Sequence, residues 1–176
     1  MSSENNKSEK SYSVHTTENF NTLIFDLGGK QNQEFKSAAR TNLVDLLTHP
    51  DHRKIREDVL NTLREKNGKE LLIQVLDNHQ KHPAFPLLVA ACWESGIDFS
   101  DRIEYFIDLS IAAPFEVSIE ALSVIEEMRF HLVDPLAGVL YDKTKAALAS
   151  HSGKPKEFVF SQILLHLDLL SNKTGE

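Results

Sequence analysis

The sequence has a single cysteine and no long apolar run. Cys92 lies inside the apolar stretch Leu87–Trp93, which excludes an intramolecular disulfide and predicts a buried thiol in a reducing compartment. No segment reaches the roughly 18 consecutive apolar residues that a membrane span needs. The stretch Met1–Tyr12 is rich in Ser, Asn, Lys and Glu and lacks the apolar core of a secretory signal peptide. We therefore expect a cytoplasmic protein.

Positive charge is also scarce. Lys and Arg number 19 against 26 Asp and Glu, which gives a net charge of −7, whereas nucleic-acid binding takes most of its affinity from Lys and Arg on phosphate. The acidic excess lies between Glu94 and Asp134, where ten acids stand against only Arg102 and Arg129. Residues 52–69 have the opposite balance, with six bases and three acids. The centre of the chain is therefore predicted to be strongly acidic.

Glycine and proline are too few for a low-complexity chain. Seven glycines and six prolines mostly separate segments of helical periodicity. With 176 residues, 41% of them apolar and 26% charged, the chain has the size and composition of one globular domain.

The ends of the chain differ from its body. Residues 1–14 carry almost nothing apolar and are expected to be a disordered tail, and residues 172–176 form a polar C-terminal tail. Within 15–32, the stretch Phe20–Leu27 has apolar residues at i, i+3, i+4 and i+7 before Gly28-Gly29, which predicts a short amphipathic helix and a hinge. Its central residues would equally suit a short strand. As a helix, this segment would dock either on its own domain or on a neighbouring molecule.

Residues 33–171 predict an all-α domain, which gives about eight helices in the chain. Apolar residues recur there at helical spacing, and the joints carry Pro, Gly or Asn-Gly. The expected helices cover 33–49 and 51–66, the stretch around Leu71–Leu76, 83–95, from Ser100 to Ile111, from Pro114 to Met128, from Asp134 to about His151, and 156–171. The last is expected to cap the domain.

The central helices repeat one another. A shift of 31 residues lays the apolar pattern of 72–76 on that of 103–107, and a shift of 32 lays the pattern of 87–93 on that of 119–125. A two-helix repeat of this length is typical of an α-solenoid, whose units bury their faces by stacking on their neighbours. Residues 69–128 are therefore predicted to be two copies of one helical pair.

One helix has a pattern that can be compared with a known family. Residues Pro114–Ile125 read PFEVSIEALSVI, which resembles the second helix of a HEAT repeat, a proline-started helix with Val, then Ala-Leu, then Ile. The helix from Pro83 is similar but has a second proline, Pro86, and no Arg after its first turn. The resemblance covers residues 33–171 and implies a short HEAT-like solenoid of antiparallel helix pairs, a fold whose families mostly bind proteins.

No group of residues has the spacing of a catalytic, cofactor or metal site. The pairs His49/His52 and His79/His82 are spaced i, i+3 but lack a third ligand, so His49 and His79 are expected to act at helix C-termini. Gly28-Gly29-Lys30 lacks the spacing of a phosphate-binding loop, and Cys92 has no neighbouring base motif. We expect neither an enzyme nor a cofactor.

The acidic centre is the strongest functional candidate. Glu116, Glu120, Glu126 and Glu127 belong to one predicted helix, and their charge would attract a basic partner. This favours a protein-binding scaffold or adaptor. Trp93, the only tryptophan, lies on a mostly apolar helix and is expected to anchor the core rather than an exposed interface.

An alternative function starts from the basic cluster. HEAT-like DNA glycosylases bind duplex through a basic concave face, and Arg53, Lys54 and Arg56 would form a weak version of such a face. The sequence therefore leaves open a nucleic-acid-binding or DNA-repair type of factor, against which the interleaved acids and the net charge argue.

Overall fold

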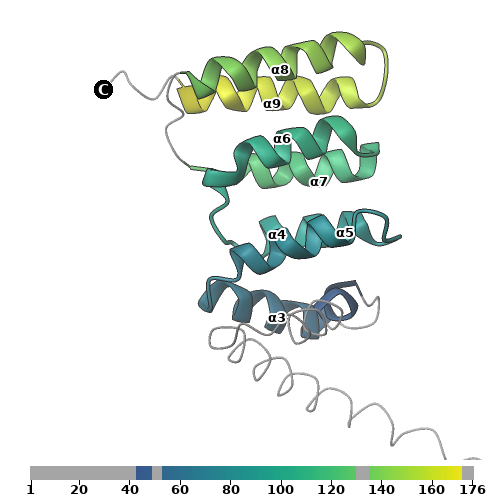
Figure 1. The fold of residues 1–176 in the computed structure, drawn as a ribbon, viewed down its shortest axis with the longest axis vertical. Helices are drawn as coiled ribbons and strands as arrows, with labels where there is room; N and C mark the ends of the chain where they lie inside the picture. Colours follow the sequence, from purple (N-terminus) through teal and green to yellow (C-terminus); the bar gives the residue numbers. More distant parts are fainter. Residues whose placement is uncertain (1–42, 49–52, 130–134, 172–176) are drawn as a thin grey trace, which may run out of the picture. The chain divides into compact units, whose positions relative to one another are not determined.

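The computed structural model describes residues 43–48, 53–129 and 135–171 (Figure 1). These residues form helices joined by turns, with no strand among them, as predicted for an all-α chain. The predictions for 1–14, for Phe20–Leu27 with its hinge, for His49/His52 and for 172–176 lie outside this part of the chain. The chain divides into two compact units, residues 1–80 and 81–176.

The first unit contains a helical segment at 43–48, α3 (Arg53–Glu65) and α4 (Lys69–Asn78). The turn between α3 and α4 follows the predicted left-handed cap. Asn67 has a φ of 53°, and the Gly68 amide donates a 2.7 Å hydrogen bond to the Leu63 carbonyl. A Cβ at Gly68 would lie 2.6 Å from Leu63 Cδ2, so any larger residue there would force the buried Leu63 side chain to shift.

The second unit consists of helices that pack against one another. Its elements are α5 (Phe85–Glu94), the 3₁₀ turn η1 (Ser100–Arg102), α6 (Ile103–Ala112), α7 (Phe115–Glu126), α8 (Leu136–Ser150) and α9 (Lys156–Ser171). Helix α9 has the predicted bounds, and α7 begins directly after Pro114 as predicted. Before α6, the Asp98 Oδ1 accepts a 2.9 Å hydrogen bond from the Ser100 amide.

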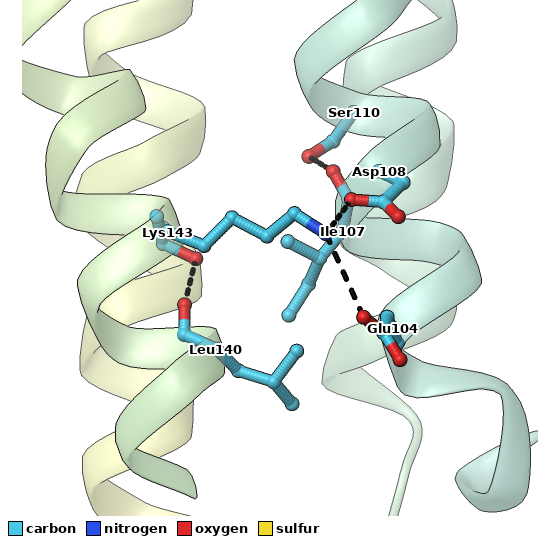
Figure 2. Close-up of polar contacts among 7 residues, drawn as sticks. Glu104, Ile107, Asp108, Ser110, Leu140 and Lys143 are labelled. Carbon is cyan, nitrogen blue, oxygen red and sulfur yellow. Dashed lines mark hydrogen bonds and ion pairs between the residues drawn. The ribbon is translucent and has the colours of Figure 1, made fainter. Parts of the chain in front are cut away.

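The helices of the second unit form two layers. Helix α6 packs against α7, and α8 packs against α9, so each short connection joins two antiparallel neighbours. Helix α7 also contacts α5 and α9, while α6 contacts α8. Figure 2 shows α6 and α8 nearer the viewer and α7 and α9 behind them. One layer therefore contains α5, α7 and α9, and the other contains α6 and α8.

Burial corrects the register of the predicted repeat. A shift of 33 residues, rather than 32, pairs every buried apolar residue of α5 except Ala90 with a buried residue of α7. The pairs are Phe85 with Ser118, Leu88 with Ala121, Val89 with Leu122, Ala91 with Val124 and Cys92 with Ile125. The shift of 32 matched hydrophobicity alone, which does not separate a buried apolar side chain from an exposed one. Under the shift of 31, Leu72, Val75 and Leu76 fall on buried residues of α6, whereas buried Ile73 falls on exposed Glu104.

Two lysines link the helix pairs of the second unit. Lys143 on α8 reaches Asp108 and lies 3.7 Å from Glu104, both on α6 (Figure 2). The hydrogen bond to Asp108 raises the pKa of Lys143. Lys156, at the start of α9, donates 2.8 Å hydrogen bonds to the carbonyls of Ile111 and Ala113 at the end of α6.

The Lys156 contact closes the C-terminus of α6, whose last carbonyls have no partner inside the helix. Nearby, the Ser118 hydroxyl lies 2.8 Å from the Ser110 carbonyl and 3.0 Å from that of Pro114. Burial lowers the pKa of Lys156, so its ammonium depends on these hydrogen bonds for compensation.

We predict that Lys156→Met destabilises the second unit by about 1 to 3 kcal/mol, because two carbonyls lose a charged donor while the apolar stem is kept. Lys145→Met is the matched control, since Lys145 is an exposed lysine on α8. Urea unfolding followed by Trp93 fluorescence measures both changes. Equal stability of the two variants would contradict the role given to Lys156.

Candidate protein-binding face

Helix α7 has described neighbours on three sides, and no described helix covers its fourth side. It packs against α5, α6 and α9, and its buried side chains, such as Val117, Ala121 and Ile125, are turned toward them. Residues advance by about 100° around a helix, so Glu116, Ser123 and Glu127 lie on the opposite side. We call the surface of the α5, α7 and α9 layer that faces away from α6 and α8 the open face.

The four predicted glutamates all lie at the surface along this free side. Glu116, Glu126 and Glu127 are exposed, and Glu120 is half-buried. Glu120 is turned toward α5, where its Oε2 accepts a 2.9 Å hydrogen bond from Trp93 Nε1. The acidic residues chosen from the sequence therefore gather on one helix face that no described helix covers.

The prediction that Trp93 anchors the core is wrong. Its side chain is 38% exposed, and its indole nitrogen needs the acceptor that Glu120 supplies. The prediction rested on the mostly apolar character of the helix, which does not say which of its sides is buried. The small residues Ala91 and Cys92 fill the core positions beside it.

Helix α9 adds an apolar stripe that the sequence reading missed. Phe158, Leu165 and Leu169 are 58%, 55% and 57% exposed. Their spacing of i, i+7 and i+11 keeps them within about 40° around the helix. The signal was in the sequence: α9 has a second apolar stripe besides its buried one, and a helix with two apolar sides needs contacts on both.

Helix geometry places this stripe on the open face. In Figure 2, α6 runs upward from Glu104 to Ser110, and α8 and α9 lie to the left of α6 and α7. Helix α9 begins at the top, because Lys156 is bonded to carbonyls at the C-terminal end of α6. The buried side of α9, centred on Ile163, is therefore turned to the right and forward, toward α7 and α8. Viewed from its N-terminus, a right-handed helix advances clockwise from one residue to the next. Counted from Ile163, this rotation makes Phe158, Leu165 and Leu169 point backward, away from α6 and α8.

The side of α9 that lies opposite α7 is more polar than the apolar stripe. The same rotation turns Ser161 and Asp168, both exposed, toward the side of α9 that lies opposite α7. A terminal cap would need a polar outer side of this kind, and the capping role of α9 stays a prediction.

The open face has little positive charge. Helices α5 and α7 contain no Lys or Arg, and α9 contains only Lys156, which is bonded to the end of α6. Carboxylates and exposed apolar side chains therefore lie together without a lysine or arginine from these helices. Such a surface suits a ligand that carries both cations and apolar groups.

The other candidate residues serve local structure. His79 Nδ1 lies 2.8 Å from the Val75 carbonyl, as expected for a histidine at a helix C-terminus, and His82 Nδ1 accepts a hydrogen bond from the Ala84 amide. Cys92 is fully buried, and burial raises the pKa of its thiol far above the usual range, which disfavours the reactive thiolate. Arg56 donates to the Leu47 carbonyl. The side chains of Arg53 and Lys54 lie outside the described atoms.

Metal ligands and membrane-spanning helices are the two remaining features of interest. No three or more His, Cys, Asp or Glu side chains come close enough to hold a metal ion within residues 43–48, 53–129 and 135–171. None of the helices described there combines the length and the apolar content of a membrane span.

Comparison with known proteins gives no relative from which a function could be transferred. The chain matches no protein-family model, no curated protein and no solved structure.

We predict that Glu120→Ala shifts the emission of Trp93 to longer wavelength by a few nanometres and makes it easier to quench, because the indole loses its acceptor. The cost in stability stays below about 1 kcal/mol at this half-exposed site. Glu120→Gln keeps an acceptor oxygen and should retain the native spectrum, as should Glu127→Ala. An unchanged spectrum in Glu120→Ala would refute the contact.

Proposed function

We propose that this chain is a protein-binding module whose helix pairs stack as a short HEAT-like solenoid, and that its open face holds a basic partner. Consecutive antiparallel pairs in two layers support the repeat architecture. In such a stack, one helix of each pair contributes to a continuous surface, and here those helices are α5, α7 and α9.

The observation that carries the proposal is the charge of α7. Its glutamates Glu116, Glu126 and Glu127 are exposed on the one side of the helix without a described neighbour. Complementary charge speeds encounter with a basic partner and discriminates against acidic ones. A scaffold or adaptor needs no catalytic group, and the proposal assigns none.

The same surface argues against the nucleic-acid alternative. Phosphates would be repelled by the open face, and Arg56 is already engaged with the Leu47 carbonyl. A duplex-binding role would have to rest on residues 52–69 alone.

We predict that the double change Glu126→Lys and Glu127→Lys abolishes capture of a basic partner. Lysine at the C-terminal end of α7 favours the helix dipole, so folding should be retained. The matched control is Asp58→Lys with Asp142→Lys, which makes the same charge change at exposed sites on α3 and α8. Affinity purification from the native cell with mass spectrometry compares the three proteins.

Binding through these charges should also weaken by about tenfold between low and physiological salt. Capture that survives the glutamate reversal would overturn the proposal, and so would capture that the control change weakens equally. So would salt-sensitive duplex binding that Arg56→Gln weakens, which would instead support the nucleic-acid alternative.

A further inference from the structure

The apolar stripe of α9 and the acids of α7 lie on the same side of one helix layer, and they require different ligand chemistry. Phe158, Leu165 and Leu169 are all more than half exposed. Solvent-exposed apolar side chains that line up along a helix mark a contact surface more often than isolated ones do. Glu116 and Glu127 lie on the neighbouring helix, on the side where the stripe also points.

We propose that the open face binds a cationic amphipathic helix of a partner protein, with its apolar side on the α9 stripe and its Lys or Arg residues on the α7 glutamates. This inference rests on the proposed function and names the chemistry of its ligand. From Phe158 to Leu169 the stripe runs for about 16 Å, which matches roughly three turns of a ligand helix. Amphipathic helices bind through apolar anchors at i, i+3 or i+4, and i+7.

Charge excludes a second copy of the chain as the occupant. Two open faces brought together would place Glu116, Glu120, Glu126 and Glu127 of each copy opposite the same acids. Like charges across an interface cost several kcal/mol in general. The face has no free lysine or arginine from α5, α7 or α9 to compensate, since Lys156 is bonded to α6.

The amphipathic segment at the start of this chain fits no better. Residues 15–27 include Glu18 and Asp26 but no Lys or Arg, so they match the apolar stripe and not the acids. A membrane surface is disfavoured for a related reason, because anionic headgroups attract basic segments and would be repelled by glutamates.

The test uses the full chain and three fluorescent 18-residue peptides. The first is an amphipathic helix with Lys on one side and Leu on the other. In the second, Glu replaces every Lys, and the third has the composition of the first in an order that removes the amphipathic pattern. Fluorescence anisotropy at physiological salt measures the Kd of each peptide.

We expect the cationic amphipathic peptide to bind at least tenfold more tightly than the scrambled one, and the anionic peptide not to bind. The double change Leu165→Ser and Leu169→Ser should weaken the first peptide by about tenfold or more, because apolar anchors dominate such contacts. The control is Leu136→Ser with Val139→Ser on α8, where the side chains are 38% and 55% exposed. This control should bind like the unchanged protein.

Each contrary result has a definite meaning. Equal binding of the ordered and scrambled cationic peptides, or no effect of the α9 serines, would overturn the amphipathic-helix inference while leaving a basic partner on α7. If Glu126→Lys with Glu127→Lys left binding of the cationic peptide unchanged, the proposed function would be overturned as well. Tighter binding to phosphatidylserine vesicles than to the peptide would assign the stripe to membranes, and dimers that Leu165→Ser with Leu169→Ser dissociates would assign it to a second copy.

Discussion

The second unit depends on the packing of α7, which has α5, α6 and α9 around three of its sides. Residues that face these neighbours are apolar or small. The hydroxyl of Ser118, which is buried among them, donates to the Ser110 carbonyl near the end of α6. No described helix covers the remaining side of α7, and that side carries Glu116, Glu126 and Glu127, whereas Glu120 is turned toward α5. The acidic surface is therefore a consequence of how α7 is buried, since charge is excluded from the sides that face its neighbours.

The net charge of that surface also depends on the lysines of the second unit, because two of them are used elsewhere. Lys143 neutralises acids of α6 from α8, and Lys156 reaches the end of α6 from α9. Both join one helix pair to the next, so neither remains to balance Glu116 or Glu127. These two lysines act between the helix pairs and not on the open face.

Local chemistry was the part of the fold that the sequence predicted well. The left-handed turn at Asn67, the start of α7 after Pro114 and the bounds of α9 each follow from a residue that acts on its immediate neighbours. Contacts between helices were harder to predict, since apolar character alone does not say which side a helix buries. Trp93 was placed in the core because its helix is mostly apolar, although adjacent residues of a helix point about 100° apart and one of them can be exposed. The candidate glutamates were found because charge is excluded from the core, whereas the stripe of α9 was missed because exposed and buried leucines look alike in a sequence.

The acids and the exposed apolar side chains of the open face would act on different steps of binding. Exposed carboxylates act at a distance and mainly raise the rate of encounter with a basic segment, an effect that salt screens within about 8 Å at physiological ionic strength. The apolar stripe acts only on contact and mainly slows dissociation. A ligand with cations alone would meet this face quickly and leave it quickly, and an apolar ligand without cations would meet it rarely. If the proposed function holds, selectivity for a segment with both properties would follow from placing the two kinds of side chain on adjacent helices of one layer.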